Sequence, residues 1–427
     1  MMMKKYIKLV VFFMCIIYGI SGCRPSDVDE ISESISVDMQ HQIKKMPYAG
    51  YFQKEIELSP YEPLHGAYLG AYVLANPQIE FDITQFEDAV GKEMAVAVRH
   101  YQLGDPFPDK WLLECLAQKK APHIVITPQS LTRPYEKAAL EETALKFKDT
   151  YGIPVFIEFY PSPKEFGDPG QYISYFQLAR EIFAHHAPNA VFVWGIDMED
   201  VYDSMVYYPG DDYVDWVGLR MYFPIYKDHE PYEVDIDKYL TYFYNMYQDK
   251  KPMMISKLAI SHYSKKGHAF YVEEAITIMN HLYTQLPVHY PRIKAINYID
   301  IDNTKVAPGD TGSDNFSVST EPKITRAYKD AIGDSYYLQN VEQSGTSNAY
   351  EWMKMRTPIY EWQNKLYVAE ETLLYDWGMT GIGHLAKAKV IIGGSEYYSL
   401  DLLVKKMNYR YTLNQDILRV YQSSKDL

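Results

Sequence analysis

The stretch Ala190-Val191-Phe192-Val193-Trp194-Gly195-Ile196-Asp197 decides the fold of this chain. It is an almost continuous apolar run that ends in an acid, which is typical of a parallel strand buried on both faces. Seven further runs of this kind lie between about residues 60 and 335: His65–Tyr72, Met94–Leu103, Pro122–Pro128, Pro154–Pro161, Val214–Tyr222, Pro252–Ala259 and Ile293–Asp302.

Helix-like segments separate many of these runs. They cover Tyr135–Tyr151, Tyr172–His186, Asp235–Tyr247, Ala269–Leu286 and Glu321–Ile332. Eight strand units that alternate with helix-like or loop segments predict an α/β protein with a (β/α)8 TIM barrel over residues 60–337. A doubly wound open sheet is the alternative, but no GxGxxG motif follows the first strand, where a dinucleotide fold requires one.

Composition narrows the choice of partner. The chain has 427 residues, of which 47% are hydrophobic, and a formal net charge of −14. A folded, acidic protein repels phosphate backbones, so nucleic acid is not expected as a partner. The 41 tyrosines suit a surface that meets sugars or another polymer, because tyrosine has a flat apolar face and a polar tip. A tyrosine-rich proteome is the alternative explanation.

The N-terminus has the pattern of a bacterial lipoprotein leader. Three lysines precede a short apolar run over Leu9–Ile20, which is followed by Ser21, Gly22 and Cys23. We therefore expect cleavage before Cys23, lipidation of Cys23 with a palmitate-type chain, and a location on the outer face of a bacterial cell membrane. Cys115 stands in an apolar helical stretch and is expected in the core.

The sequence divides into five segments. These are a signal peptide over residues 1–22, the lipidated Cys23 with a polar tether over 23–59, the barrel over 60–337, a linker over 338–356 and a small α+β interaction domain over 357–427. The last segment carries a strand–helix–strand pattern twice, which hints at an internal repeat. It resembles the copper-amine-oxidase N-terminal-like domain of bacterial surface proteins, which implies adhesion or interaction, and no metal motif is present in it.

Functional side chains of a barrel lie at the carboxyl ends of its strands. Acids, tyrosines and a tryptophan there are typical of a saccharide-binding cleft. The candidates for substrate binding are Glu158, Trp194, Asp197, Glu199, Arg220, Tyr222, Asp300 and Asp302.

Several motifs in the correct order resemble the barrel of glycoside hydrolase family 26, which contains β-mannanases and β-glucanases. The segment Tyr208–Gly218 resembles the approach to the sixth strand of that family, Phe86–Lys92 its first helix, and Lys251–Ile255 the approach to its seventh strand. Ala190–Trp194 and Ile293–Asp302 resemble its fifth and eighth strands. The resemblance covers roughly residues 60–335 and implies a polysaccharide as partner.

The two catalytic positions depart from the pattern of that family. Ser162 stands where the resemblance implies the acid/base glutamate, and Lys257 stands where it implies the nucleophile. Retaining hydrolysis needs two carboxyl groups about 5–5.5 Å apart. A serine cannot deliver the proton at neutral pH, and an ammonium group cannot attack the sugar. We therefore name no catalytic residue.

A charge exchange accompanies this departure. Glu158 stands where the family carries an arginine, and strand alternation places it on the same face as Ser162. We expect Glu158 to pair with Lys257, because an unpaired buried charge is costly.

Other chemistries find less support. No HExxH spacing and no GxSxG elbow occurs, so neither a metal site nor a serine triad is expected, and no cofactor is implied. Asp197, Glu199, Asp300 or Asp302 could form a relocated carboxylate pair. The sequence favours a non-catalytic glycan-binding or scaffolding lipoprotein. The alternatives are an active glycoside hydrolase with non-standard carboxylates and a purely structural envelope protein.

Overall fold

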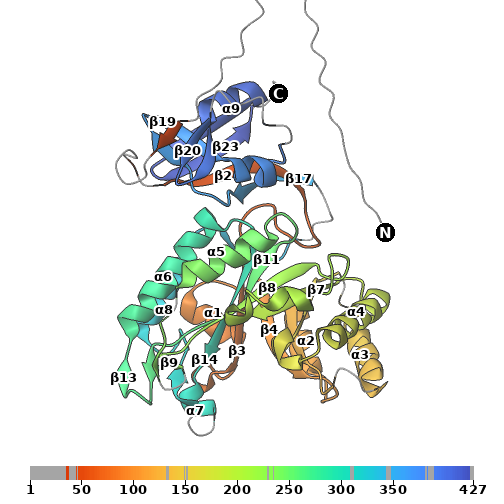
Figure 1. Ribbon diagram of the computed structural model, residues 1–427. Helices are drawn as coiled ribbons and strands as arrows, with labels where there is room; N and C mark the ends of the chain where they lie inside the picture. The colour runs from red at the N-terminus through yellow and green to blue at the C-terminus, as the bar shows by residue number, and fades with distance from the viewer. Residues whose placement is uncertain are drawn as a thin grey trace, which may run out of the picture.

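The computed structural model describes most of the chain from residue 47 onward. The described residues are 35–37, 45, 47–130, 134–148, 150, 152–227, 230–233, 235–307, 312–342, 348–379, 382 and 389–423. The expected signal peptide and the expected lipidation site, Cys23, lie outside these residues. Figure 1 shows two bodies, a large barrel and a smaller unit of sheets.

Eight parallel strands form the larger body and close on themselves. Their order is β3 to β8, then β11 and β14, and β14 pairs with β3 to complete the barrel. The strands are β3 (Ala67–Ala75), β4 (Val96–Gln102), β5 (Ala121–Thr127), β6 (Val155–Phe159), β7 (Ala190–Asp197), β8 (Trp216–Phe223), β11 (Met253–Ile260) and β14 (Ile293–Ile301). Every apolar run predicted as a barrel strand forms one, so the (β/α)8 barrel is confirmed.

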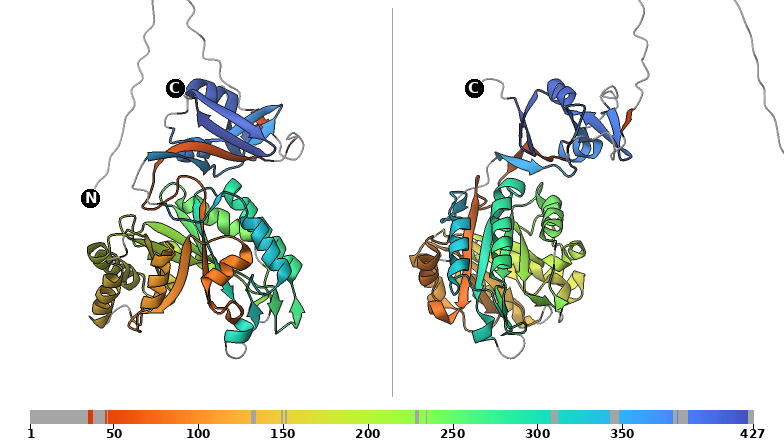
Figure 2. Two further views of the ribbon diagram at one scale, coloured as in Figure 1. Left: turned by 180° about the vertical axis from the view of Figure 1, so that it is seen from behind. Right: turned by 90° about the vertical axis from the view of Figure 1, so that its left-hand side faces the viewer.

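Helices cover the outside of the barrel between most strands (Figure 2). They are α1 (Ile83–Val90), α2 (Asp109–Ala117), α3 (Pro134–Lys146), α4 (Pro169–His186), α5 (Ile236–Tyr247), α6 (Val272–His289), the short α7 (Asn303–Val306) and α8 (Pro322–Ile332). Only the short 3-10 turns η3 (Met198–Asp200) and η4 (Ser204–Tyr207) connect β7 to β8. This connection therefore leaves the end of β7 close to loops rather than under a long helix.

The interior of the barrel is layered. Inward positions recur at every second residue of each strand, and those near the amino ends are apolar, as with Tyr68, Ala121, Phe156 and Trp216. The indole of Trp216 donates to the carbonyl of Pro60 (2.9 Å), which fixes this floor. Polar side chains occupy the next layer and the cavity described below lies above them. The apolar floor thus closes one end of the barrel and leaves the other end for a site.

The smaller body contains strands from both ends of the chain. One sheet has the order β17-β2-β23-β22, with β2 (Ala49–Glu57) between β17 (Asn348–Lys354) and β23 (Ile417–Gln422). The other has the order β1-β20-β21-β19-β18, in which β1 (Ile35–Val37) pairs with β20 (Lys389–Ile392). The barrel is therefore inserted between β2 and β17, which are neighbouring antiparallel strands.

These strands change the boundaries drawn from the sequence. Residues 49–57, expected as part of the tether, form β2, and residues 348–354, expected as part of the linker, form β17. Polar residues interrupt both stretches, at Gln53–Glu55 of β2 and at Glu351 of β17, so neither is a continuous apolar run of the kind that marks a buried strand. Leu58, Phe52 and Ile56 instead belong to the core of the smaller body.

The smaller body contains one structural unit twice. A two-residue turn at Gln363 and Asn364 joins β18 (Tyr360–Trp362) to β19 (Lys365–Ala369), and a turn at Gly393 and Gly394 joins β20 to β21 (Ser395–Ser399). All four turn residues have positive φ, as two-residue hairpins require. A π-helical turn (Thr372–Asp376) soon follows β19 and α9 (Leu400–Met407) follows β21, which matches the repeat expected from the sequence.

The smaller body contacts the amino end of the barrel. Lys294, at the start of β14, forms an ion pair with Glu351 of β17 (2.8 Å), and both side chains are buried. Gln248, just after α5, exchanges two hydrogen bonds with the backbone of Lys354. Tyr51 of β2 contacts His289 at the end of α6 (2.9 Å). The carboxyl ends of the barrel strands therefore point away from the smaller body (Figure 1).

Candidate functional site

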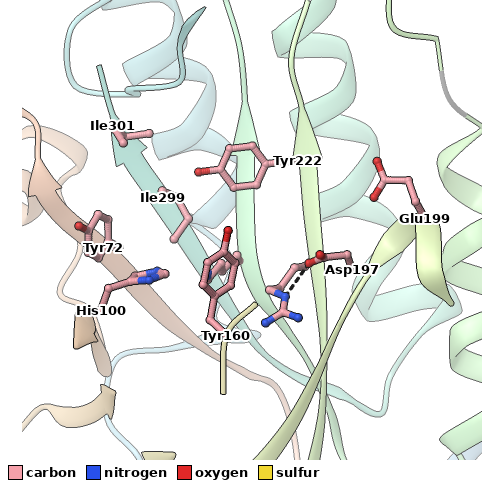
Figure 3. A pocket seen from close by; sticks show the side chains of 10 residues that line it. Tyr72, His100, Tyr160, Asp197, Glu199, Tyr222, Ile299 and Ile301 are labelled. Atoms are coloured by element: carbon pink, nitrogen blue, oxygen red, sulfur yellow. Dashed lines mark hydrogen bonds and ion pairs between the residues drawn. The ribbon is translucent and has the colours of Figure 1, made fainter. Parts of the chain in front are cut away.

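A cavity of about 460 Å³ opens at the carboxyl ends of the barrel strands. Seven of the eight strands or the residues after them contribute to its wall, as Figure 3 shows for most of them. Its lining is Tyr72, His100, Tyr160, Asp197, Glu199, Arg220, Tyr222, Lys257, Ile299 and Ile301. In this fold, the position is the one where binding and catalytic sites are found.

Aromatic rings form one side of the cavity. His100 meets Tyr72 edge-on (5.4 Å between ring centroids) and Tyr160 edge-on (5.6 Å). Burial, and then the nearby charge of Lys257, lowers the pKa of His100 to about 3, so this imidazole is neutral at physiological pH. Tyr222 stands across from them, 38% exposed, with its ring against Phe316. The rings offer apolar faces and hydroxyl groups to a ligand.

Two carboxylates line the wall, and each has a cation of its own. Asp197, at the end of β7, accepts from Nε of Arg220 at 2.6 Å. Glu199 contacts Nζ of Lys227 at 2.5 Å and accepts from the hydroxyl of Tyr232 at 2.9 Å. Burial acts to raise the pKa of Glu199, but these two partners outweigh it and lower the pKa. Glu199 is therefore ionised at neutral pH.

A buried polar network lies beneath the cavity and centres on Glu158. Its carboxylate is 3.2 Å from Nη1 of Arg220, 3.1 Å from Nε2 of His123 and 3.1 Å from the hydroxyl of Ser256. Asn297 supports His123 from the other side at 2.9 Å. Burial acts to raise the pKa of Glu158, but the contacts with His123 and Arg220 outweigh it and lower the pKa to about 2. Glu158 is thus a permanent anion with no exposed surface.

The network needs a glycine on the next strand. Gly195 faces inward on β7, and a Cβ atom there would overlap with the carboxylate of Glu158. The same relation holds between Gly70 of β3 and the side-chain amide of Asn297. These glycines let the backbones approach the polar side chains that fill the middle layer.

Lys257 reaches the cavity through an irregularity in β11. The register between β11 and β8 shifts between Ile255 and Lys257. As a result, two consecutive residues face the barrel interior: Ser256 contacts Glu158, and Lys257 lines the cavity. Such a bulge re-aims one side chain. The residue is 4% exposed, and its Nζ atom lies 4.0 Å above the ring of Tyr160. Burial, and then the charge of Arg220, lowers the pKa of Lys257 to about 7.

The pairing expected between Glu158 and Lys257 is not the one that the structure contains. Glu158 pairs with Arg220, and within the described ranges Lys257 has no carboxylate oxygen within the 4.0 Å of an ion pair. Arg220, and not Lys257, is the cation that pairs with Glu158, because it lies at an inward position of β8. That strand is next to β7, which in turn is next to β6. It also donates to the carbonyl groups of Phe159 and Gly195, which fixes its orientation.

Trp194 and Ser162 do not line the cavity. Trp194 is 0% exposed, and its ring packs edge-on against Tyr208 (5.0 Å) in the layer between strands and helices. Asp197, Gly195 and Val193 face inward, so strand alternation turns Trp194 outward. The prediction that Trp194 lines the cleft and stacks on sugar rings is therefore wrong. Ser162 lies buried past the end of β6 and donates to Asp200 at 2.9 Å.

Asp300 and Asp302 also lie outside the cavity, where they have structural partners. Asp300 has no exposed surface and accepts hydrogen bonds from Asn76, from Ser319 and from the backbone of Val318. Burial outweighs these bonds and raises its pKa to about 6. Asp302 caps α7 through the backbone of Thr304 and contacts Lys305 at 3.2 Å. Both acids therefore hold loops in place.

The chemistry open to this wall follows from its charges. A glycosidase needs one protonated carboxyl group to release the leaving oxygen and a second carboxylate on the reacting sugar. Of the described acids, Asp197 and Glu199 line the cavity, and each is bound to a cation. Asp300, an acid whose pKa is raised, is buried elsewhere. The wall thus supplies hydrogen-bonding groups and ring faces, together with a single amine.

Several residues of the site were not singled out from the sequence. Tyr72, His100 and Ile299 are inward positions of their strands and could have been found by counting every second residue from the strand ends. His123 is a polar residue at such a position in an apolar run, opposite Glu158. The inward aim of Lys257 has no signal in the alternation pattern, because the bulge that produces it breaks that pattern.

The described residues hold neither a metal-binding cluster nor a membrane-spanning helix. Within them, no three His, Cys, Asp or Glu side chains come together as a set that could hold a metal ion. None of their helices has the length and apolar character that a membrane crossing needs. Cys115 is buried on α2, as its sequence context predicts.

Comparison with known proteins gives likenesses at the level of the fold. No protein-family model and no curated protein matches the chain. The enzyme GH26C from a Muricauda species is 11% identical with a TM-score of 0.48, over 64% of this chain and 87% of that one. The catalytic domain of a GH26 endo-β-1,4-mannanase from Bacillus sp. JAMB-750 is 13% identical with a TM-score of 0.46, over 64% and 87%.

A Bacteroides uniformis β-glucuronidase is 13% identical with a TM-score of 0.43, over 63% of this chain and 35% of that one. The fold of this chain follows from its own strand order, which is that of a closed eight-stranded parallel barrel.

Proposed function

We propose that this chain is a lipid-anchored surface protein whose glycosidase-like barrel binds a polysaccharide or cell-envelope glycan without cleaving it. Tyr72, Tyr160 and Tyr222 would stack on sugar rings, and Asp197 and Glu199 would accept hydrogen bonds from sugar hydroxyl groups. The ligand class is a neutral or weakly charged saccharide, because the cations of the wall already have acid partners, apart from Lys257.

One observation carries the non-catalytic part of the proposal. Both carboxylates of the cavity are held by cations, Asp197 by Arg220 and Glu199 by Lys227. An acid that donates its proton in the transition state needs a raised pKa, whereas the partners of Glu199 lower its pKa. The wall therefore favours binding of hydroxyl groups over protonation of a glycosidic oxygen.

The arrangement of the two bodies suits an anchored receptor. The chain passes from Cys23 into β1 and β2, which belong to the smaller body. That body contacts the amino end of the barrel through Lys294 and Glu351, and the cavity opens at the opposite end. A lipid on Cys23 would thus hold the smaller body toward the membrane and present the cavity to the outside.

Binding is tested with the soluble chain that starts after Cys23. Affinity electrophoresis in gels containing β-mannan, mixed-linkage β-glucan, xylan or purified cell wall is expected to retard it with at least one polymer. Tyr222→Ala should weaken that binding roughly fivefold, the worth of about 1 kcal/mol of ring contact. Tyr202→Ala is the matched control, because Tyr202 is 39% exposed, close to the 38% of Tyr222, and does not line the cavity. Equal retardation of both variants and the parent would contradict the proposal.

The alternative of an active hydrolase is tested with the same polymers. Long incubation followed by a reducing-end assay is expected to release no sugar. Release that disappears in both Asp197→Asn and Glu199→Gln would mean that these carboxylates form a working pair. The protein would then be an enzyme.

The anchor is tested separately in the producing cell. Labelled palmitate should enter the parent chain and a Cys15→Ser variant, whose change lies within the apolar run of the leader. Cys23→Ser should take up no label and leave the membrane fraction. Labelled Cys23→Ser protein would overturn the lipid anchor while leaving the glycan-binding proposal open to its own test.

A further inference from the structure

Lys257 is the group of the cavity that the proposed function does not use. Its Nζ atom is on the cavity wall, 4.0 Å from the centre of the Tyr160 ring. Among the described residues it has no hydrogen-bond acceptor and no ion-pair partner within bonding distance. The charges that reach it come from three strands: Arg220 on β8, Glu158 on β6 and Asp197 on β7. His100 on β4 also lines the cavity but is neutral.

Two other buried lysines and two half-buried lysines of the described chain are bound to acceptors. Nζ of Lys92 donates to the carbonyls of Ile332 and Asp334, and Nζ of Lys251 donates to the carbonyl of Asp211. Lys120 and Lys294 each pair with a glutamate. Lys257 is different because its amine is turned by a strand bulge into an open cavity and left without an acceptor.

We propose that Lys257 is a nucleophilic amine that forms a reversible imine with an aldehyde or ketone bound in the cavity. The proposal concerns the same cavity as the glycan site but does not depend on glycan binding. The ligand class is a small hydroxylated carbonyl compound, because the wall around the amine offers the carboxylate of Asp197 and the ring faces of Tyr160 and Tyr222.

The reaction balances without any redox partner. The lone pair of the neutral amine attacks the carbonyl carbon, the C–N bond forms, and the carbonyl oxygen takes up a proton. The resulting carbinolamine loses that oxygen as water, and the nitrogen loses its hydrogens to give the C=N bond. The net change is R–CHO plus the Lys257 amine giving the imine plus one water.

The surroundings of Lys257 suit each stage. Burial and the charge of Arg220 lower its pKa to about 7, so a large part of the amine is unprotonated at neutral pH, as a nucleophile requires. The protonated imine is a cation, and it would lie over the Tyr160 face that now holds the amine. Asp197 lies on the same wall, and its charge, which favours the cationic form of the Lys257 amine, would favour the cationic imine as well.

The test traps the imine. The soluble chain is incubated with glyceraldehyde and sodium cyanoborohydride at pH 7.5, which converts an imine to a stable secondary amine, and modified lysines are quantified by peptide mass spectrometry. We expect Lys257 to be labelled at least tenfold faster than Lys354. Lys257→Met should remove that fast phase, and circular dichroism confirms that the variant is folded.

Lys354 is the control that distinguishes the effect of the cavity from the effect of a lowered pKa alone. Burial lowers its pKa to about 8, so its neutral fraction at pH 7.5 is within about threefold of that of Lys257. Its Nζ atom lies over the ring of Tyr290 instead, outside the cavity. Labelling of Lys257 no faster than that of Lys354, or no labelling of either, would overturn the proposal.

The imine proposal and the glycan-binding proposal can fail independently of each other. Lys257→Met is run in the same affinity gels as the parent chain. Polymer binding without fast labelling of Lys257 would refute the imine and leave the glycan-binding proposal intact. Fast labelling without polymer binding would do the reverse.

Discussion

Arg220 and Glu158 form an ion pair in the interior of the barrel, with 3.2 Å between Nη1 and Oε1 and no more than 2% of either side chain exposed. The guanidinium also binds Asp197 at 2.6 Å on the cavity wall. One arginine therefore ties the buried middle layer to the site above it. A change in the network is transmitted directly to a carboxylate that we place against the ligand.

Arg220→Met should strongly destabilise the fold. The change leaves Glu158 as a buried charge without its main cation, for which the cost is about 3–5 kcal/mol. Urea unfolding of the soluble chain measures it. The double variant Arg220→Met with Glu158→Met should regain part of that loss, since both charges are then gone. Losses that simply add would mean that the two side chains are not coupled.

Gly195→Ala should also be costly, because its Cβ would overlap with the Glu158 carboxylate. We expect a loss of about 2–4 kcal/mol, as for overpacking together with a disturbed buried charge. Gly170→Ala near the start of α4 is the control: its Cβ would meet Asp168 at an ordinary 3.5 Å, so the helix should gain up to about 1 kcal/mol. Similar unfolding midpoints for the two variants would speak against the close approach of β7 to Glu158.

Lys257→Met should change the pH dependence of stability. The folded pKa of Lys257, about 7, lies below the unfolded value of 10.5, so the unfolded chain binds more protons between these values. The wild-type chain therefore carries the full penalty below pH 7 and loses it as the pH rises toward 10.5. The free energy of unfolding of the variant minus that of the wild type should therefore be about 3 kcal/mol larger at pH 6 than at pH 9.5. Urea unfolding at both pH values checks this, and an equal difference at the two would contradict the buried amine.

Asp300→Asn should weaken the loop that follows β14. Asp300 accepts from Asn76, Ser319 and the backbone of Val318, and an amide NH2 would face some of these donors. A buried donor left without an acceptor costs about 1–3 kcal/mol. Asp203→Asn, whose carboxyl group is 74% exposed, should leave the unfolding free energy within about 0.5 kcal/mol of the wild type. Equal stabilities would mean that Asp300 does not hold the loop.

Barrel strands were predictable because their chemistry is local. A strand buried on both faces must be apolar along its length, so runs such as Ala190–Asp197 can be recognised in the sequence. The inward aim of Arg220 and Tyr222 follows from the same alternation. The partner of Glu158 did not follow, because alternation gives the face of a residue but leaves open which side chain across the barrel reaches it.

Lys257 and β2 show two further limits. A bulge moves Lys257 out of the alternation, and its origin lies in the pairing of β11 with β8, which one strand alone does not encode. The strand β2 is half exposed and polar, and its partners β17 and β23 lie near the other end of the chain. A strand whose partners are that distant carries little local signal, so it was assigned to the tether.

The insertion of the barrel between β2 and β17 also sets an order for synthesis. The strand β2 leaves the ribosome early, yet its neighbour β23 contains Val420 and Gln422, close to the last residues of the chain. The barrel can close as soon as β14 is made, while Phe52 and Ile56 of β2 still lack the neighbours that come from β17 and β23. Until β17 and β23 are made, these side chains form an uncovered apolar segment of the nascent chain. A chain cut before β23 would then keep the barrel and the pair of β2 with β17 but leave the other edge of β2 unpaired.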